Sequence, residues 1–181
     1  MKPSTKRSAS KANGTYKEEP KLFKTGNDLP KKSRIETIAL VNKRLADAID
    51  LHMQMKQAHW NVKGPNFIGL HELFDKIHEA TGEYVDTIAE RAVQLGGIAE
   101  GTVRISAKRT LLPEYPQGIA EGPAHVDAVS NALAAFGHEV RQSIDEADEL
   151  NDADTADIFT EVSRGIDKWL WFVEAHAQAA K

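Results

Sequence analysis

Three residues of metal-binding type, His59, His71 and Asp75, are spaced so that a helical hairpin would bring them together. His59 lies six residues before Pro65, and His71 lies six residues after it. Antiparallel helices that turn at Pro65 would place both imidazoles at the same height. Asp75 lies one helical turn beyond His71, on the same face. Two imidazoles and a carboxylate suit a divalent transition metal such as iron.

A second pair of carboxylates, Asp86 and Glu90, lies further along the same predicted helix and on the same face. The eleven residues from Asp75 to Asp86 complete nearly three turns, but they also rise about 16 Å. Ligands of one metal ion lie only about 2 Å from it. One straight helix therefore cannot bring both groups of ligands to one ion.

A second copy of the chain would remove this difficulty. His71 and Glu90 lie equally far from the midpoint of residues 80–81, and so do Asp75 and Asp86. If two copies of the helix cross antiparallel at a two-fold axis there, His71 and Asp75 of one copy face Glu90 and Asp86 of the other. The spacing predicts two identical metal sites per dimer, each with ligands from both subunits.

The alternative interpretation of these residues is structural. Acidic residues at helical spacing usually form a solvated face, and a single histidine usually packs in a core. We interpret His52, one heptad before His59, as such a core or interface histidine, with metal binding as the less favoured alternative. The same two-fold axis pairs His78 with Glu83, either as a supporting contact or without a role.

The composition fits one domain that binds no membrane. The 181 residues are 41% hydrophobic and 28% charged, and they include no cysteine. The lack of cysteine excludes disulfides, thiol catalysis and thiolate metal sites. No apolar run approaches the roughly 20 residues of a membrane span, and no apolar segment follows the basic N-terminus. These features predict a cytoplasmic protein.

Helical periodicity dominates the chain after residue 33 and predicts four long helices. Turn residues separate them at 64–66, at 96–97 and 113–123, and at 151–154. Asp152 or Asp154 is expected to cap the last helix. Two hairpins joined by a long middle connection, with a short helix near 102–108, predict an all-α, ferritin-like four-helix bundle over residues 34–181.

The charge is distributed unevenly along the chain. Residues 1–34 carry ten Lys or Arg and three Asp or Glu, a net charge of +7, whereas the remainder carries thirteen and twenty-four, a net charge of −11. Residues 1–33 contain few large apolar side chains, so we predict a mobile basic arm there. Such arms often bind nucleic acid; the alternative is a solubilising tail.

The motifs HWNVKG at 59–64, HELFD at 71–75 and DTIAER at 86–91 resemble those of the Dps family, the miniferritins known as DNA-binding proteins from starved cells. The stretches QLGG at 94–97, DADTADIF at 152–159 and DKWLWFVE at 167–174 look like the same family. The resemblance covers roughly residues 35–176. The spaced metal motif is specific, whereas the individual helices are not.

The resemblance implies a ferroxidase centre with two irons at the dimer interface. Its ligands would be His59, His71 and Asp75 from one subunit, with Asp86 and Glu90 from the two-fold mate. It also implies a hollow shell of twelve subunits that oxidises ferrous iron, usually with hydrogen peroxide, and stores the ferric product. The chain has no Glu-x-x-His motif, which argues against the di-iron site found inside ordinary ferritin bundles.

Further roles are predicted for three groups of residues. Trp60, beside His59, is either an aromatic that intercepts oxidising equivalents, as the resemblance implies, or a packing residue. Asp152, Asp154 and Asp157 either line a negative pore for iron entry or form a solvated helix end. Non-specific DNA contacts are expected from the arm, through Lys2, Lys6, Arg7, Lys11 and Lys17.

Two functions follow from these predictions. The first is an iron-oxidising and iron-storing protein that protects DNA from oxidative stress and associates with the nucleoid. The second is a chiefly structural shell that compacts DNA and whose metal sites hold zinc or are idle.

Overall fold

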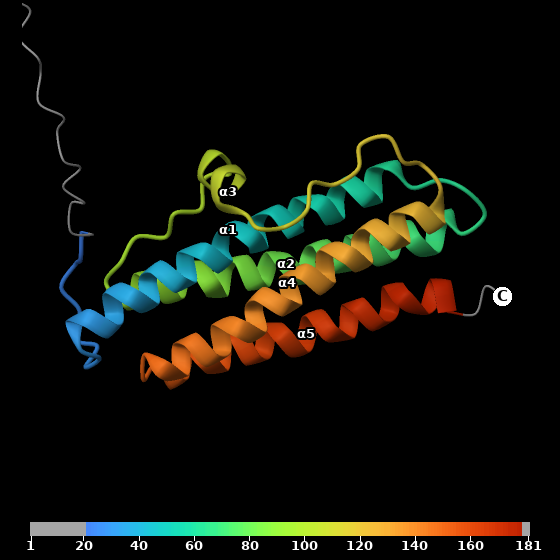
Figure 1. The fold of residues 1–181 in the computed structure, drawn as a ribbon. Helices are drawn as coiled ribbons and strands as arrows, with labels where there is room; N and C mark the ends of the chain where they lie inside the picture. The colour runs from blue at the N-terminus through green and yellow to red at the C-terminus, as the bar shows by residue number, and fades with distance from the viewer. Residues whose placement is uncertain (1–20, 179–181) are drawn as a thin grey trace, which may run out of the picture.

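The computed structural model describes residues 21–178, which form four long helices and one short helix. Figure 1 shows the long helices side by side and the short α3 in the connection that passes over α1. The all-α, ferritin-like architecture predicted from the sequence is confirmed. The helices are α1 (Lys31–Asn61), α2 (Phe67–Gln94), α3 (Val103–Arg109), α4 (Gly122–Glu149) and α5 (Ala153–Gln178).

The long helices form two hairpins, α1 with α2 and α4 with α5, and the hairpins pack through α1 against α4 and α2 against α5. Apolar residues recur at three- and four-residue steps, so each helix turns one apolar stripe inward. Fully burying a large apolar side chain contributes about 1.5–3 kcal/mol. The largest side chains with no more than marginal exposure include Leu45, Leu51, Met55, Phe74, Ile77, Phe136, Phe159 and Ile166.

The crossover between the hairpins is held against α1 by polar side chains of that helix. The backbone N–H of Leu111 donates to the carboxylate of the buried Asp47 at 2.7 Å, and the hydroxyl of Thr110 donates to Asp50 at 2.8 Å. At the far end of the crossover, just beyond the end of α1, the backbone N–H of Lys63 donates to the carbonyl of Ala120 at 2.8 Å. These contacts run along α1, so the crossover is fixed over much of its length.

The described part of the predicted arm begins at residue 21 and packs on the body. The N–H of Phe23 donates to the carbonyl of Gly96 at 2.8 Å, just beyond the end of α2. Gly96 has a φ of +84°, and a β-carbon there would lie 2.6 Å from the carbonyl oxygen of Phe23, so only glycine fits. The helix α1 begins at Lys31, three residues before the predicted boundary of the body.

A buried ion pair joins the end of α2 to the start of α5. The guanidinium of Arg91 donates to Asp152 at 2.5 Å, and both side chains are almost fully buried. The carboxylate of Asp152 also accepts from the N–H and the hydroxyl of Thr155. Asp152 is therefore the N-terminal cap of α5. It is one of the two candidates that the sequence predicts. Throughout residues 21–178, no helix has the length and apolar character needed to cross a bilayer.

We predict that Asp152→Ala lowers the free energy of unfolding by about 3–5 kcal/mol, because it removes the buried carboxylate that pairs with the Arg91 charge and removes a helix cap. Denaturant unfolding followed by circular dichroism measures this loss. Asp154→Ala is the matched control, because Asp154 is exposed and 3.8 Å from Arg91; its effect should be at most about 1 kcal/mol. Equal effects of the two substitutions would contradict the structural role of Asp152.

Candidate metal centre

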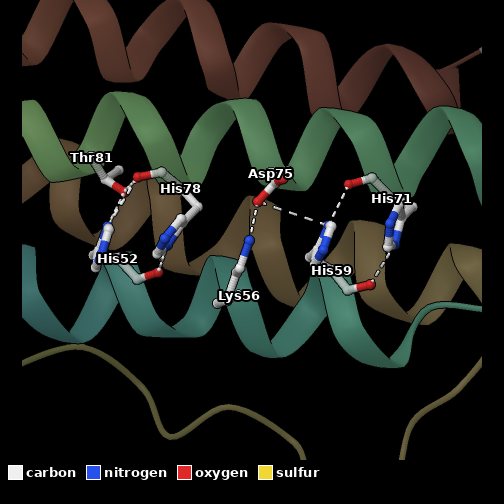
Figure 2. A network of polar contacts seen from close by, with 7 residues as sticks. All are labelled: His52, Lys56, His59, His71, Asp75, His78 and Thr81. Carbon is white, nitrogen blue, oxygen red and sulfur yellow. Dashed lines mark hydrogen bonds and ion pairs between the residues drawn. The ribbon is translucent and has the colours of Figure 1, made fainter.

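Two imidazoles from opposite helices stack where the first hairpin nears its turn. His59 on α1 and His71 on α2 have ring centroids 3.7 Å apart and ring planes 23° apart. His59 Nδ1 lies 2.8 Å from the carbonyl oxygen of His71, and His71 Nδ1 lies 2.9 Å from the carbonyl oxygen of His59. Figure 2 shows this reciprocal pair between the two helices.

The reciprocal hydrogen bonds determine which nitrogen of each imidazole can bind a metal. A carbonyl oxygen only accepts, so the proton of each neutral ring lies on Nδ1 and the lone pair lies on Nε2. Metal-ligating histidines commonly donate their second nitrogen to a carbonyl in this way, which fixes the ring and its tautomer. The predicted ligands His59 and His71 are therefore adjacent and oriented by backbone of the opposite helix.

Asp75 is the third predicted ligand from this chain, and it is engaged by a lysine. Lys56 on α1 forms an ion pair with Asp75, whose carboxylate oxygen lies 4.0 Å from His59 Nδ1. The hydrogen bond from Lys56 holds the pKa of Asp75 below its usual value, with a smaller contribution from His59. A cation that binds this carboxylate must displace or rearrange the Lys56 ammonium.

The remaining predicted ligands, Asp86 and Glu90, are exposed on α2. They share that exposed side with the acidic residues Glu79 and Glu83. Nowhere in residues 21–178 do three His, Asp or Glu side chains of one chain gather closely enough to hold a metal ion. The five predicted ligands therefore do not form one site within the subunit, and the intersubunit site stays a prediction.

The other predicted residues have different environments. Trp60 is 61% exposed, so it does not fill the core of the subunit. Asp154 and Asp157 are exposed and stay candidates for a pore, whereas Asp152 is buried and its oxygens are taken by Arg91 and Thr155. The predicted DNA-binding residues all lie outside the described residues; they are Lys2, Lys6, Arg7, Lys11 and Lys17.

Several polar contacts of this region were not predicted. His52 stacks on His78 as His59 does on His71. The signal was present, because His52 and His78 lie thirteen residues on either side of Pro65. His125 is fully buried on α4 and shares a 2.7 Å hydrogen bond with the hydroxyl of Tyr115; no spacing in the sequence indicates this contact.

Comparison with known proteins agrees with this architecture. Residues 38–181 match the family model of the ferritin-like domain. The chain is 46% identical to a DNA protection during starvation protein of Agrobacterium fabrum, over 87% of this chain and 98% of the relative. By fold and by these matches, it is a ferritin-like protein.

Solved structures narrow the class further. DpsC from Streptomyces coelicolor superimposes with a TM-score of 0.84 at 31% identity, covering 93% of this chain and 98% of that one. Mycobacterium smegmatis Dps gives 0.81 at 32% identity, covering 87% and 96%. The chain belongs to the Dps family.

We predict that Lys56→Met raises the pKa of Asp75 toward its usual value, because the hydrogen bond from Lys56 stabilises the charged carboxylate. Carbon NMR of protein labelled at aspartate carboxylates measures the titration, with Asp75→Asn assigning the resonance. Lys76→Met is the control, since Lys76 is an exposed lysine beside Asp75 in sequence and has no described ion pair with it. An unchanged titration in Lys56→Met would contradict the ion pair.

Proposed function

We propose that this protein oxidises ferrous iron with hydrogen peroxide at two-fold interfaces of a twelve-subunit shell and stores the ferric product. The observation that carries the proposal is the stacked His59–His71 pair, whose Nε2 atoms are left as metal ligands beside Asp75. Asp86 and Glu90 would complete the site from the partner subunit. Along α2, Asp86 lies about 16 Å from Asp75 and Glu90 lies about 22 Å from it. Only a second chain closes these separations.

The proposed ligands suit the chemistry of this reaction. Iron is the substrate, imidazoles bind its ferrous form, and carboxylates favour the ferric form that the reaction produces. Two ferrous ions held together supply the two electrons that convert one hydrogen peroxide molecule and two protons to two water molecules. Paired delivery of electrons avoids release of hydroxyl radical, which is how such a centre would protect DNA.

The relatives support this proposal through their names and sequences. Proteins of Agrobacterium fabrum, Brevibacillus brevis and Mycolicibacterium smegmatis are each called DNA protection during starvation protein, and they are 46%, 32% and 33% identical to this chain. A Dps structure from Microbacterium arborescens in a high-iron form has a TM-score of 0.76 with this chain. The high-iron form named for that structure fits the proposed iron cargo.

A subunit-mixing experiment tests whether the site is shared. One variant carries His71→Ala with Asp75→Ala, and the other carries Asp86→Ala with Glu90→Ala. Neither variant alone should oxidise ferrous iron with peroxide. After dissociation, equal mixing and reassembly, half of the dimers are mixed and half of their sites are intact, so about one quarter of wild-type activity should return.

The oxidation rate, followed by ferric absorbance after anaerobic ferrous loading, is the readout. Wild-type protein taken through the same dissociation and reassembly is the control for recovery. If the mixture stays as inactive as each variant, the site does not draw ligands from two subunits. If His71→Ala with Asp75→Ala oxidises iron normally, these residues are not ligands at all.

The same assay distinguishes iron oxidation from the competing function. That function is a structural shell that compacts DNA and holds zinc or no metal. Such a shell would bind ferrous iron weakly or not at all and would not consume peroxide in proportion to it. If the wild-type protein consumes no peroxide, that result would favour this competing function.

DNA binding through the arm is the less direct part of the proposal. The body carries a net charge of −11 and repels phosphate, whereas residues 1–34 carry +7. Several copies of the arm on one shell would act together, so that weak contacts add to a high apparent affinity.

Asp154 and Asp157 stay the candidates for an iron-entry pore.

Removal of residues 1–17 should abolish the mobility shift of DNA at low salt, because it deletes the proposed phosphate contacts. A full-length variant with Gln at positions 2, 6, 7, 11 and 17 is the matched control for chain length, and it should behave like the deletion. Binding by the wild-type protein should weaken steeply as salt increases. An unchanged shift in both variants would assign DNA binding to another surface.

A further inference from the structure

A second imidazole pair lies two helical turns away from the first pair and has the same geometry. His52 and His78 have ring centroids 3.7 Å apart and planes 23° apart, the same values as for His59 and His71. Each Nδ1 lies 2.9 Å from the carbonyl oxygen of the other histidine. Figure 2 shows the two pairs on either side of the Lys56–Asp75 ion pair.

The second pair is too far from the first to share its ion. Seven residues of α1 separate His52 from His59, a rise of about 10 Å. The same reasoning about tautomers applies, so Nε2 of His52 and of His78 carries the lone pair. Among residues 21–178, no hydrogen bond to either Nε2 is described.

The surroundings of His52 favour the form of its ring that binds cations. Burial and the neighbouring His78 lower the pKa of His52, which favours the neutral ring. The hydroxyl of Thr81 lies 3.3 Å from His52 Nδ1 and donates to the carbonyl of His78, which adds to the fixed geometry. Metal-ligating histidines are commonly held in this way, because the ring nitrogen that does not bind the metal donates a hydrogen bond.

A glycine on α2 makes room for the His52 ring. A β-carbon at Gly82 would lie 3.3 Å from His52 Cε1, closer than most side-chain contacts. Glycine inside a helix costs about 1 kcal/mol relative to alanine, so its presence in the middle of α2 needs a packing reason. Accommodation of the imidazole is that reason.

A third ligand comes from the two-fold axis on which the proposed function rests. His78 and Glu83 lie equally far from the midpoint of residues 80–81, so the axis brings Glu83 of the partner subunit to His78. Glu83 is exposed on α2 and has no described ion pair within residues 21–178. Two imidazoles, one carboxylate and one water complete the four-coordinate shell that zinc prefers.

We propose that His52, His78 and Glu83 of the partner subunit form a second metal site, which binds a divalent cation of the zinc class across the dimer interface. With a single carboxylate it does not favour the ferric state. It therefore holds a cation and fastens the two subunits, whereas the first centre oxidises iron.

Calorimetric titration of the chelator-stripped, full-length assembly with Zn²⁺ tests the proposal. The wild-type protein should bind one more equivalent per subunit than His52→Gln with His78→Gln. Glu83→Gln should weaken that equivalent by at least about ten-fold. His138→Gln, at an exposed histidine of α4 outside both pairs, is the matched control and should leave binding unchanged.

Co²⁺ supplies a second measurement, because tetrahedral cobalt absorbs strongly in the visible. That absorption should persist in His71→Ala with Asp75→Ala and disappear when His52→Gln and His78→Gln are added to that variant. His52→Gln with His78→Gln alone should still oxidise iron. Equal stoichiometry and affinity in every variant would overturn the proposal. Loss of binding in the histidine variant with no effect of Glu83→Gln would overturn the intersubunit part.

The outcomes separate this inference from the proposed function. If wild-type protein fails to oxidise iron but its extra Zn²⁺ equivalent still depends on His52, His78 and Glu83, the proposed oxidation is wrong and the second site stands. If oxidation follows the subunit-mixing prediction and the extra equivalent is missing, the second site is wrong. Glu83 is exposed, so its substitution tests the site without disturbing the core.

Discussion

The structure of the candidate site depends on the register between α1 and α2. In this register, imidazoles of one helix reach the backbone carbonyls of the other at 2.8–2.9 Å, twice along the hairpin. Each bond joins an imidazole to a backbone carbonyl of the opposite helix and holds a half-buried ring in one tautomer. A shift of one residue between the helices would break all four bonds together, so the register and the ligand geometry are the same constraint.

Much of the fold follows from the sequence because its signals are local. Apolar residues at helical steps predict the helices, and Gly64, Pro65 and the glycines at 96–97 predict where they end. The short helix in the crossover was expected near 102–108 and lies at Val103–Arg109. Distance from Pro65 also predicts that His59 meets His71.

Contacts that depend on packing between distant segments were harder to predict. The pairing of Arg91 with Asp152 joins residues of two hairpins, and no periodic pattern reports it. The same pairing explains why Asp152 is buried although an acidic run at a helix start suggests a solvated surface. The contact of Lys56 with Asp75 is different, because these residues lie nine residues before and ten residues after Pro65, so the hairpin itself indicates that they meet. The shared site itself depends on a second chain, which local signals cannot position.

The length of α1 separates the segment around Phe23 from the candidate metal ligand His59. The described chain enters at residue 21 beside the end of α2, where Phe23 contacts Gly96, and α1 begins at Lys31. His59 lies near the opposite end of that helix, 28 residues on, a rise of about 40 Å. The position of residue 21 on the body is thus several nanometres from the imidazoles. An oxidant released by the proposed iron chemistry would have to travel that distance to reach the base of the proposed DNA-binding arm.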